Sequence, residues 1–127
     1  MMSDERGTED TKPHDLRVRT RSFALRIVRL YTSLPKSAEA QVLGKQLLRS
    51  GTSVGAHYHE GTRARSNAEF ISKLQGGLQE LEETVYWLNL LIDSGIIKKE
   101  KLSGLCQEAD ELAAIFVASV KTVKRRT

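Results

Sequence analysis

The chain has 127 residues and a net charge of +4, from 20 Lys and Arg against 16 Asp and Glu. This length predicts one domain that buries its own core, and the single cysteine, Cys106, excludes an intrachain disulfide and favours a reducing, cytoplasmic setting. Only two prolines occur, Pro13 and Pro35, which disfavours an all-β domain, and no apolar run is long enough to span a membrane.

The N-terminal part is predicted to contain a tail and a first helix. Residues 1–13 are charged and lack apolar periodicity, which is typical of a disordered tail ahead of a bundle over residues 14–127. A helix is expected from about Asp15, its N-cap, to Ser33, with Pro35 marking the exit. Its apolar stripe consists of Leu16, Phe23, Ile27 and Leu30.

A second helix is predicted from about Ser37, as N-cap, to His59. Its inner stripe consists of Val42, Leu43, Leu47, Ser50, Val54 and Tyr58. Gly44, Gly51 and Gly55 lie inside it, and each costs about 0.5–1 kcal/mol relative to Ala. Close helix packing is the favoured explanation, and an exposed backbone patch for a partner is the alternative.

A third helix begins with a capping box, in which Ser66 precedes Glu69 by three residues, and ends at Gly95. Its heptad seam consists of Phe70, Leu74, Leu78, Leu81, Val85, Leu88 and Ile92. A hairpin centred between residues 63 and 64 would place Gly51 level with Gly76. Facing glycines would let the two helices approach closely.

A fourth helix is predicted from about Glu100 to Lys124, with cations in its last turn. Its seam consists of Leu102, Leu105, Ala109, Leu112, Phe116, Ser119 and Val123. Amphipathic helices joined by short loops predict an all-α fold, an antiparallel up-down-up-down four-helix bundle.

The segment from Val85 to Ile92 is apolar around the whole helix, which one small bundle cannot bury. The residues that point away from the seam, and are therefore expected to form an oligomer interface, are Tyr86, Trp87, Leu90 and Leu91. The alternative is that Trp87 or Leu91 only widens the contact with an adjacent helix.

The charge is unevenly distributed, because the first helix and the C-terminus are basic and the third helix is acidic. The candidate nucleic-acid-binding residues are Arg17, Arg21, Arg29, Lys121, Lys124, Arg125 and Arg126. A solvated face, or complementary charge between copies, would explain the same distribution. The carboxylates Glu80, Glu82 and Glu83 are interpreted as an acidic face that is solvated or lies between subunits.

No residue set predicts catalysis, a cofactor, a metal site or a small-molecule substrate. His57 and His59 are two positions apart on a helix, so they cannot hold one ion together, and Glu60 adds only a second ligand. Cys106 lies near the fourth helix's seam and is interpreted as a small buried hydrophobe.

The stretch from Gln46 to Glu82 resembles a known family, whose pattern is Gln-Leu-x-Arg-Ser-x-x-Ser-Val, Glu-Gly, Ser-x-x-Glu-Phe, then Gly and Glu-Leu-Glu. The matching residues are Gln46, Leu47, Arg49, Ser50, Ser53, Val54, Glu60, Gly61, Ser66, Glu69, Phe70, Gly77, Glu80, Leu81 and Glu82. The pattern is similar to that of the bacterial 23S rRNA intervening-sequence family, often labelled S23 ribosomal protein. The resemblance covers about residues 16–120.

The resemblance implies a four-helix bundle that assembles as a homopentamer with a central channel. The polar motif positions to follow are Arg49, Ser53, His57, Glu60, Arg63 and Arg65. His57 stands where the family usually has Asn, and Ala64 stands where it usually has Arg. A related branch, the accessory variability proteins of retroelements, uses a basic pentamer that binds a reverse transcriptase and nucleic acid.

The expected function is therefore a non-enzymatic, cytoplasmic, homo-oligomeric scaffold or adaptor. A nucleic-acid-binding accessory protein, with RNA or DNA as its partner, is the alternative.

Overall fold

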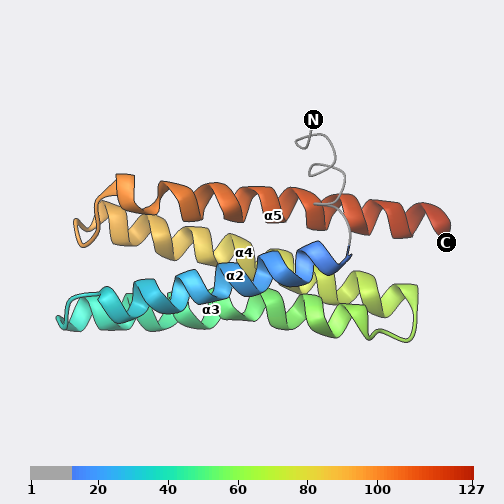
Figure 1. The fold of residues 1–127 in the computed structure, drawn as a ribbon, viewed down its shortest axis with the longest axis horizontal. Helices are drawn as coiled ribbons and strands as arrows, with labels where there is room; N and C mark the ends of the chain where they lie inside the picture. The colour runs from blue at the N-terminus through green and yellow to red at the C-terminus, as the bar shows by residue number, and fades with distance from the viewer. Residues whose placement is uncertain (1–12) are drawn as a thin grey trace.

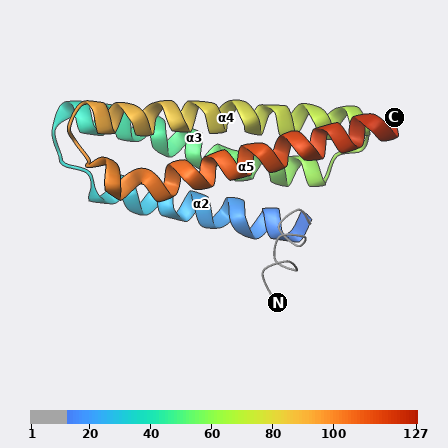
Figure 2. The same cartoon turned by 90° about the horizontal axis from the view of Figure 1, so that it is seen from above.

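Four α-helices make up the fold in a computed structural model that describes residues 13–127, with side chains described from Leu16 onward. The helices are α2 (Pro13–Ser33), α3 (Ala38–Thr62), α4 (Asn67–Asp93) and α5 (Lys99–Arg126). Successive helices run in opposite directions along one axis (Figures 1 and 2), and residues 13–127 contain no strand. The predicted all-α, antiparallel up-down-up-down bundle is confirmed. The expected tail lies almost entirely outside the described residues.

Local sequence chemistry sets most helix ends where we expected them. Ser37 Oγ accepts a hydrogen bond from the Ala40 amide at 3.4 Å, and Ser66 Oγ accepts one from the Glu69 amide at 3.1 Å. Gly95 follows α4 with a φ of 77°, a conformation that favours glycine. The N-cap expected at Asp15 is wrong, because α2 already begins at Pro13, whose fixed φ suits a first helical position.

The core runs the length of the bundle, between the inner stripes of all four helices. On α4 the buried positions are Leu74, Gly77, Leu81, Thr84, Leu88 and Leu91. The predicted seam of this helix is therefore rotated, because Leu78, Val85 and Ile92 lie half-buried at its edge. On α3, Val42 was expected in the inner stripe but is 62% exposed.

Gly44, Gly51 and Gly55 of α3 face α2, whereas Gly61 near the end of α3 faces Leu74 of α4. A Cβ on Gly51 would lie 2.8 Å from Cγ1 of Ile27, and one on Gly44 would lie 2.6 Å from Cδ1 of Leu34. Close packing of α2 on α3 therefore explains these two glycines. The expectation that Gly51 and Gly76 face each other at the same height of the bundle is wrong. Gly76 faces His57, which lies nearly two turns beyond Gly51 on α3.

The contact between α2 and α5 is sparse compared with the contacts between successive helices. One ion-pair cluster bridges it. Arg19 donates through Nη2 to Glu108 at 2.8 Å and to Glu111 at 2.9 Å, and through Nε to Glu108 at 3.1 Å. This arginine is therefore neutralised within the chain.

Candidate functional site

A polar network joins the outer edges of α3 and α4. Arg49 lies 3.3 Å from Glu80 and also pairs with Glu83, and His57 Nε2 lies 3.8 Å from Glu80 Oε2. Ser53 donates to the carbonyl of Arg49 at 2.6 Å. Of the carboxylates expected on a solvated or intersubunit face, Glu82 is exposed, whereas Glu80 and Glu83 also pair with an arginine of the same chain.

Deeper between α3 and α4, two small polar residues and a glycine set the spacing of the helices. The hydroxyls of Ser50 and Thr84 lie 2.9 Å apart and are fully buried. A Cβ on Gly76 would lie 2.8 Å from Nδ1 and Cε1 of His57, so this glycine makes room for the imidazole. His57 Nδ1 is shielded from solvent and has no hydrogen-bond partner among the described residues. His57 therefore contributes packing to this contact.

The remaining polar motif residues do not join this network and make separate contacts. Glu60 pairs with Lys73 of α4 at 3.1 Å, and His59 faces α2. Arg63 caps α3, and the amide of Arg65 donates to Glu69 at 3.0 Å. No group of three or more His, Cys, Asp or Glu side chains in the described part of the chain is placed to hold a metal ion.

Of the four residues expected at an oligomer interface, Leu91 belongs to the chain's own core, with 0% of its surface exposed. Tyr86 is 57% exposed, and Trp87 and Leu90 are half-buried. The Tyr86 and Trp87 rings pack edge to face, with centroids 5.0 Å apart. Trp87 Nε1 is shielded and has no hydrogen-bond partner among the described residues.

The α3–α4 ion pair shows which residues share this outer face. Val42 lies two turns before Arg49 on α3, and Leu90 lies two turns after Glu83 on α4. Because the helices are antiparallel, both steps lead toward the same end of the bundle. Val42 and Leu90 therefore lie on the face of the Arg49–Glu83 pair, toward the same end of the bundle. We call these two residues, with Leu43, Tyr86 and Trp87 next to them on the same helices, the α3–α4 apolar patch.

Most of the predicted nucleic-acid-binding residues lie in one half of the bundle, but Arg29 does not. Arg65 and Arg126 line the same pocket, beside the α3–α4 loop. We call the five exposed cations Arg63, Arg65, Lys124, Arg125 and Arg126 the basic end. None of them has an ion pair with a carboxylate of the described residues. Arg29 lies near the other end of the bundle, in a pocket with Ile97 and Lys101.

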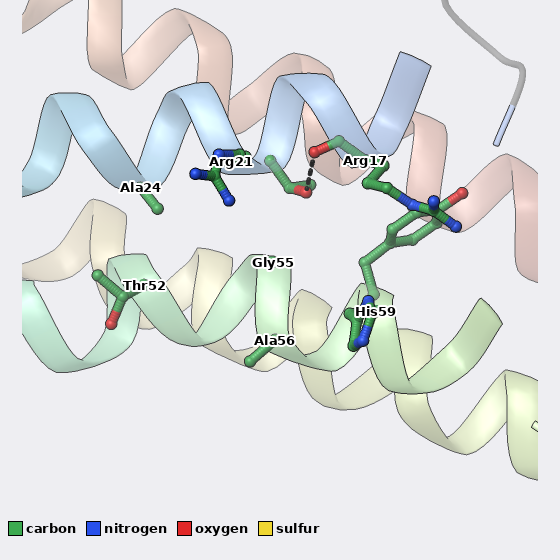
Figure 3. Close-up of a pocket in the computed structure, with 9 residues that line it drawn as sticks. Arg17, Arg21, Ala24, Thr52, Gly55, Ala56 and His59 are labelled. Atoms are coloured by element: carbon green, nitrogen blue, oxygen red, sulfur yellow. Dashed lines mark hydrogen bonds between the residues drawn. The ribbon is translucent and has the colours of Figure 1, made fainter. Parts of the chain in front are cut away.

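A groove between α2 and α3 lies in the same half of the bundle (Figure 3). On the α2 side it is lined by Arg17, Thr20, Arg21 and Ala24; on the α3 side it is lined by Thr52, Gly55, Ala56, Tyr58 and His59. Its volume is about 330 Å³. Burial raises the pKa of Tyr58, and the positive charge of Arg17 opposes that rise. The groove is thus a cationic site with a floor of small side chains.

Cys106 is half-buried and packs against the core. Burial raises the pKa of its thiol, and the negative charge of Asp110 raises it further. A raised pKa reduces the thiolate fraction at neutral pH, so this cysteine is a poor nucleophile.

The comparisons with known proteins agree with this geometry. The model of the 23S rRNA-intervening sequence protein family matches residues 14–118. The chain belongs to this family. A crystal structure of a protein of unknown function from the S23 ribosomal protein family, from Bacteroides thetaiotaomicron VPI-5482, is 38% identical with a TM-score of 0.81. The match covers 86% of this chain and 97% of that one. No curated protein sequence matches.

This intervening-sequence protein shows what its motif residues do structurally. Arg49, Ser50, Gly77, Glu80 and Glu69 all lie at helix ends or in contacts between helices. The sequence did not predict the buried contact of Thr84 with Ser50 or the shared pocket of Arg65 and Arg126. Neither follows from periodicity within one helix. None of the helices between residues 13 and 127 is both long and apolar enough to cross a bilayer.

Proposed function

We propose that this intervening-sequence protein is a non-enzymatic, cytoplasmic scaffold or adaptor that assembles with copies of itself. The α3–α4 apolar patch is the observation that supports this proposal most directly. Val42 and Tyr86 are 62% and 57% exposed, and the half-buried Trp87 and Leu90 extend the same surface. Contiguous exposed apolar surface of this kind is typical of protein interfaces.

The occupant of the patch is a second copy of the chain, and a pentamer is the assembly that the family resemblance implies. Aromatic side chains are enriched at interface centres, where they bury large areas. Tyr86 and Trp87 supply such a centre, and Val42 and Leu90 supply apolar contacts around it. Arg49 and Glu83, which lie beside the patch, provide polar groups for its rim.

Mass measurement by light scattering tests the assembly, with variants that separate one apolar surface from another. We expect a multi-subunit mass for the wild type and a smaller mass for Val42→Glu. Val18→Glu on α2 is the matched control, because Val18 is 63% exposed and the charge change is the same. A monomeric wild type at high concentration, or dissociation by Val18→Glu but not by Val42→Glu, would contradict the proposed interface.

A second candidate function is nucleic-acid binding through the basic end. The observation in its favour is that Arg65 of the α3–α4 loop and Arg126 of α5 line one pocket, with the other three cations of the basic end close to them along the chain. None of the five pairs with a carboxylate of the described residues. Such clusters bind the phosphate backbone with an affinity that falls steeply with salt.

Fluorescence anisotropy with labelled RNA and DNA, over a range of salt concentrations, tests this candidate. Arg125→Gln/Arg126→Gln should weaken binding and lower the log–log salt slope by about 0.7 for each single-strand phosphate contact that is lost. Lys98→Gln/Lys99→Gln, at the start of α5, is the control with the same charge change. No binding at low salt, or an equal loss in the control, would overturn the assignment.

A further inference from the structure

Three arginines of α2 differ in whether they pair with a carboxylate of the described residues. Arg19, on the side of α2 that faces α5, is neutralised by Glu108 and Glu111. Arg17 and Arg21, which line the α2–α3 groove, have no ion pair with a carboxylate of the described residues. They are one helical turn apart, so both guanidinium groups serve the same groove (Figure 3).

The composition of the groove favours an anion. No acidic residue is among the nine described residues that line it, and His59 from α3 faces the two arginines across it. The hydroxyls of Thr20 and Thr52 donate to backbone carbonyls of their own helices, at 3.3 Å and 2.7 Å, which leaves their oxygens able to accept. The positive charge of this groove is therefore not balanced by its own walls.

Gly55 supplies a second argument, because helix packing does not require it. A Cβ at this position would lie 3.4 Å from Oγ1 of Thr20, an ordinary contact, whereas at Gly51 it would lie 2.8 Å from Ile27. A glycine inside a helix still costs about 0.5–1 kcal/mol relative to alanine. At Gly55 the missing side chain opens the floor of the groove between Arg17, Arg21 and His59.

We propose that the α2–α3 groove is a phosphate-binding site, with Arg17 and Arg21 as its ligands and Gly55 providing the space. The guanidinium fork matches the oxygens of a phosphate group, and two such forks one turn apart match its double charge. The volume of about 330 Å³ lies at the small end of ligand pockets, which suits one phosphate with part of the group that carries it. The phosphate belongs either to a free phosphate monoester or to one residue of a polynucleotide strand.

Nuclear magnetic resonance titration with inorganic phosphate, at constant ionic strength set with chloride, tests the site. We expect saturable shifts of the amide signals of residues 52–59. In Arg17→Gln/Arg21→Gln the affinity should fall about tenfold or more, since hydrogen bonds to charged groups are the strong ones. Arg29→Gln is the control on the same helix, because it removes one exposed arginine, about three turns from Arg17, that has no carboxylate partner among the described residues.

Gly55→Val provides an independent variant that keeps every charge. Its side chain fills the floor of the groove, so phosphate binding should be lost while the far-UV circular dichroism spectrum stays unchanged. Absence of a saturable shift in the wild type, full binding by Gly55→Val, or an equal loss in Arg29→Gln would each overturn the proposal.

Two further probes identify the source of the phosphate. Tighter binding of adenosine 5′-monophosphate than of inorganic phosphate, with no further gain for a short single-stranded RNA, supports a free phosphate monoester. A gain only with the RNA supports a polynucleotide, and that outcome rests on the nucleic-acid candidate above. Arg125→Gln/Arg126→Gln should leave the inorganic phosphate titration unchanged, so failure of the basic end and failure of the groove are distinguishable.

Discussion

Alanine substitutions at Gly51 and Gly55, two of the glycines of α3 that face α2, should change the stability of the bundle in opposite directions. At Gly51 the new Cβ would lie 2.8 Å and 2.9 Å from the two γ-carbons of Ile27, which is fully buried. Isoleucine is branched at Cβ and stiff at χ1, so it cannot rotate out of the way, and α2 must shift. At Gly55 the same atom would only touch Thr20 at 3.4 Å.

The magnitudes follow from two opposing contributions. Overpacking a core costs about 1–3 kcal/mol, whereas replacing Gly by Ala inside a helix stabilises it by about 0.5–1 kcal/mol. We expect Gly51→Ala to lose about 1 kcal/mol net and Gly55→Ala to gain about 0.5–1 kcal/mol. Gly44→Ala should fall between them, because its Cβ meets Cδ1 of Leu34, the mobile end of a long side chain, at 2.6 Å.

Urea unfolding followed by far-UV circular dichroism measures these differences. All variants must be compared at one protein concentration, because self-association would add a concentration-dependent contribution to stability. The expected separation between Gly51→Ala and Gly55→Ala is about 1.5–2 kcal/mol, or roughly 5–10 °C in Tm. If Gly51→Ala is as stable as Gly55→Ala, close packing of α2 on α3 is not the reason for these glycines.

Three further predictions concern polar contacts. Ser66→Ala should cost about 1 kcal/mol in urea unfolding, because it removes the N-cap of α4, whereas the exposed, mid-helix Ser72→Ala should change little. A double-mutant cycle with Ser50→Ala and Thr84→Val should give a coupling of about 0.5–1.5 kcal/mol, and additive losses would mean that the 2.9 Å contact contributes nothing. Hydrogen bonds from Gln107 and Arg19 lower the pKa of Glu111 below its ordinary 4.5, so the ionised carboxylate stabilises the folded chain above that pH. This contribution should be lost as the pH falls through the folded-state pKa, and Arg19→Gln should flatten that part of a Tm-against-pH profile.

The number, order and ends of the helices could be predicted because they depend on local chemistry. Ser37 and Ser66 cap the helices that follow them through their own hydroxyls, and Gly95 supplies the positive φ that ends α4. Each of these signals acts over three or four residues and needs no knowledge of the neighbouring helices. Pro13 was the exception, because a proline tolerated in a first turn was interpreted as part of the tail.

Which face of each helix points into the core could not be predicted in the same way. Periodicity identified a leucine stripe on α4, but two of the buried positions are Gly77 and Thr84, which do not resemble core residues in sequence. Gly77 is there because a Cβ would lie 2.6 Å from Phe116 of α5, and Thr84 is there because Ser50 of α3 contacts its hydroxyl. Both positions are buried because of residues on other helices. A pattern taken from α4 alone therefore includes residues that lie at the edge of the core.

Ion pairing explains why net charge gave only a weak indication of function. Arg19 and Arg49 contribute to the basic balance of the sequence, yet each is paired with two carboxylates of the same chain. Arg17, Arg21, Arg65 and Arg126 have no such partner among the described residues, and these four lie in one half of the bundle. The total charge therefore does not show which cations have a carboxylate partner among the described residues.

The position of the α3–α4 apolar patch relative to this charge makes the proposed functions compatible. The patch lies toward the start of α3 and the end of α4, whereas the basic end lies at the opposite end of the bundle, where α3 ends and α4 begins (Figure 1). Association through the patch would leave the basic end of every copy free to bind. Linked copies of a weak site bind a long anionic partner far more tightly than one copy does, provided that the geometry lets them engage together. Val42→Glu should then weaken binding of a long RNA much more than binding of a short one, although Val42 lies far from the cations. Equal effects on both lengths, measured by anisotropy, would show that assembly and RNA binding are independent.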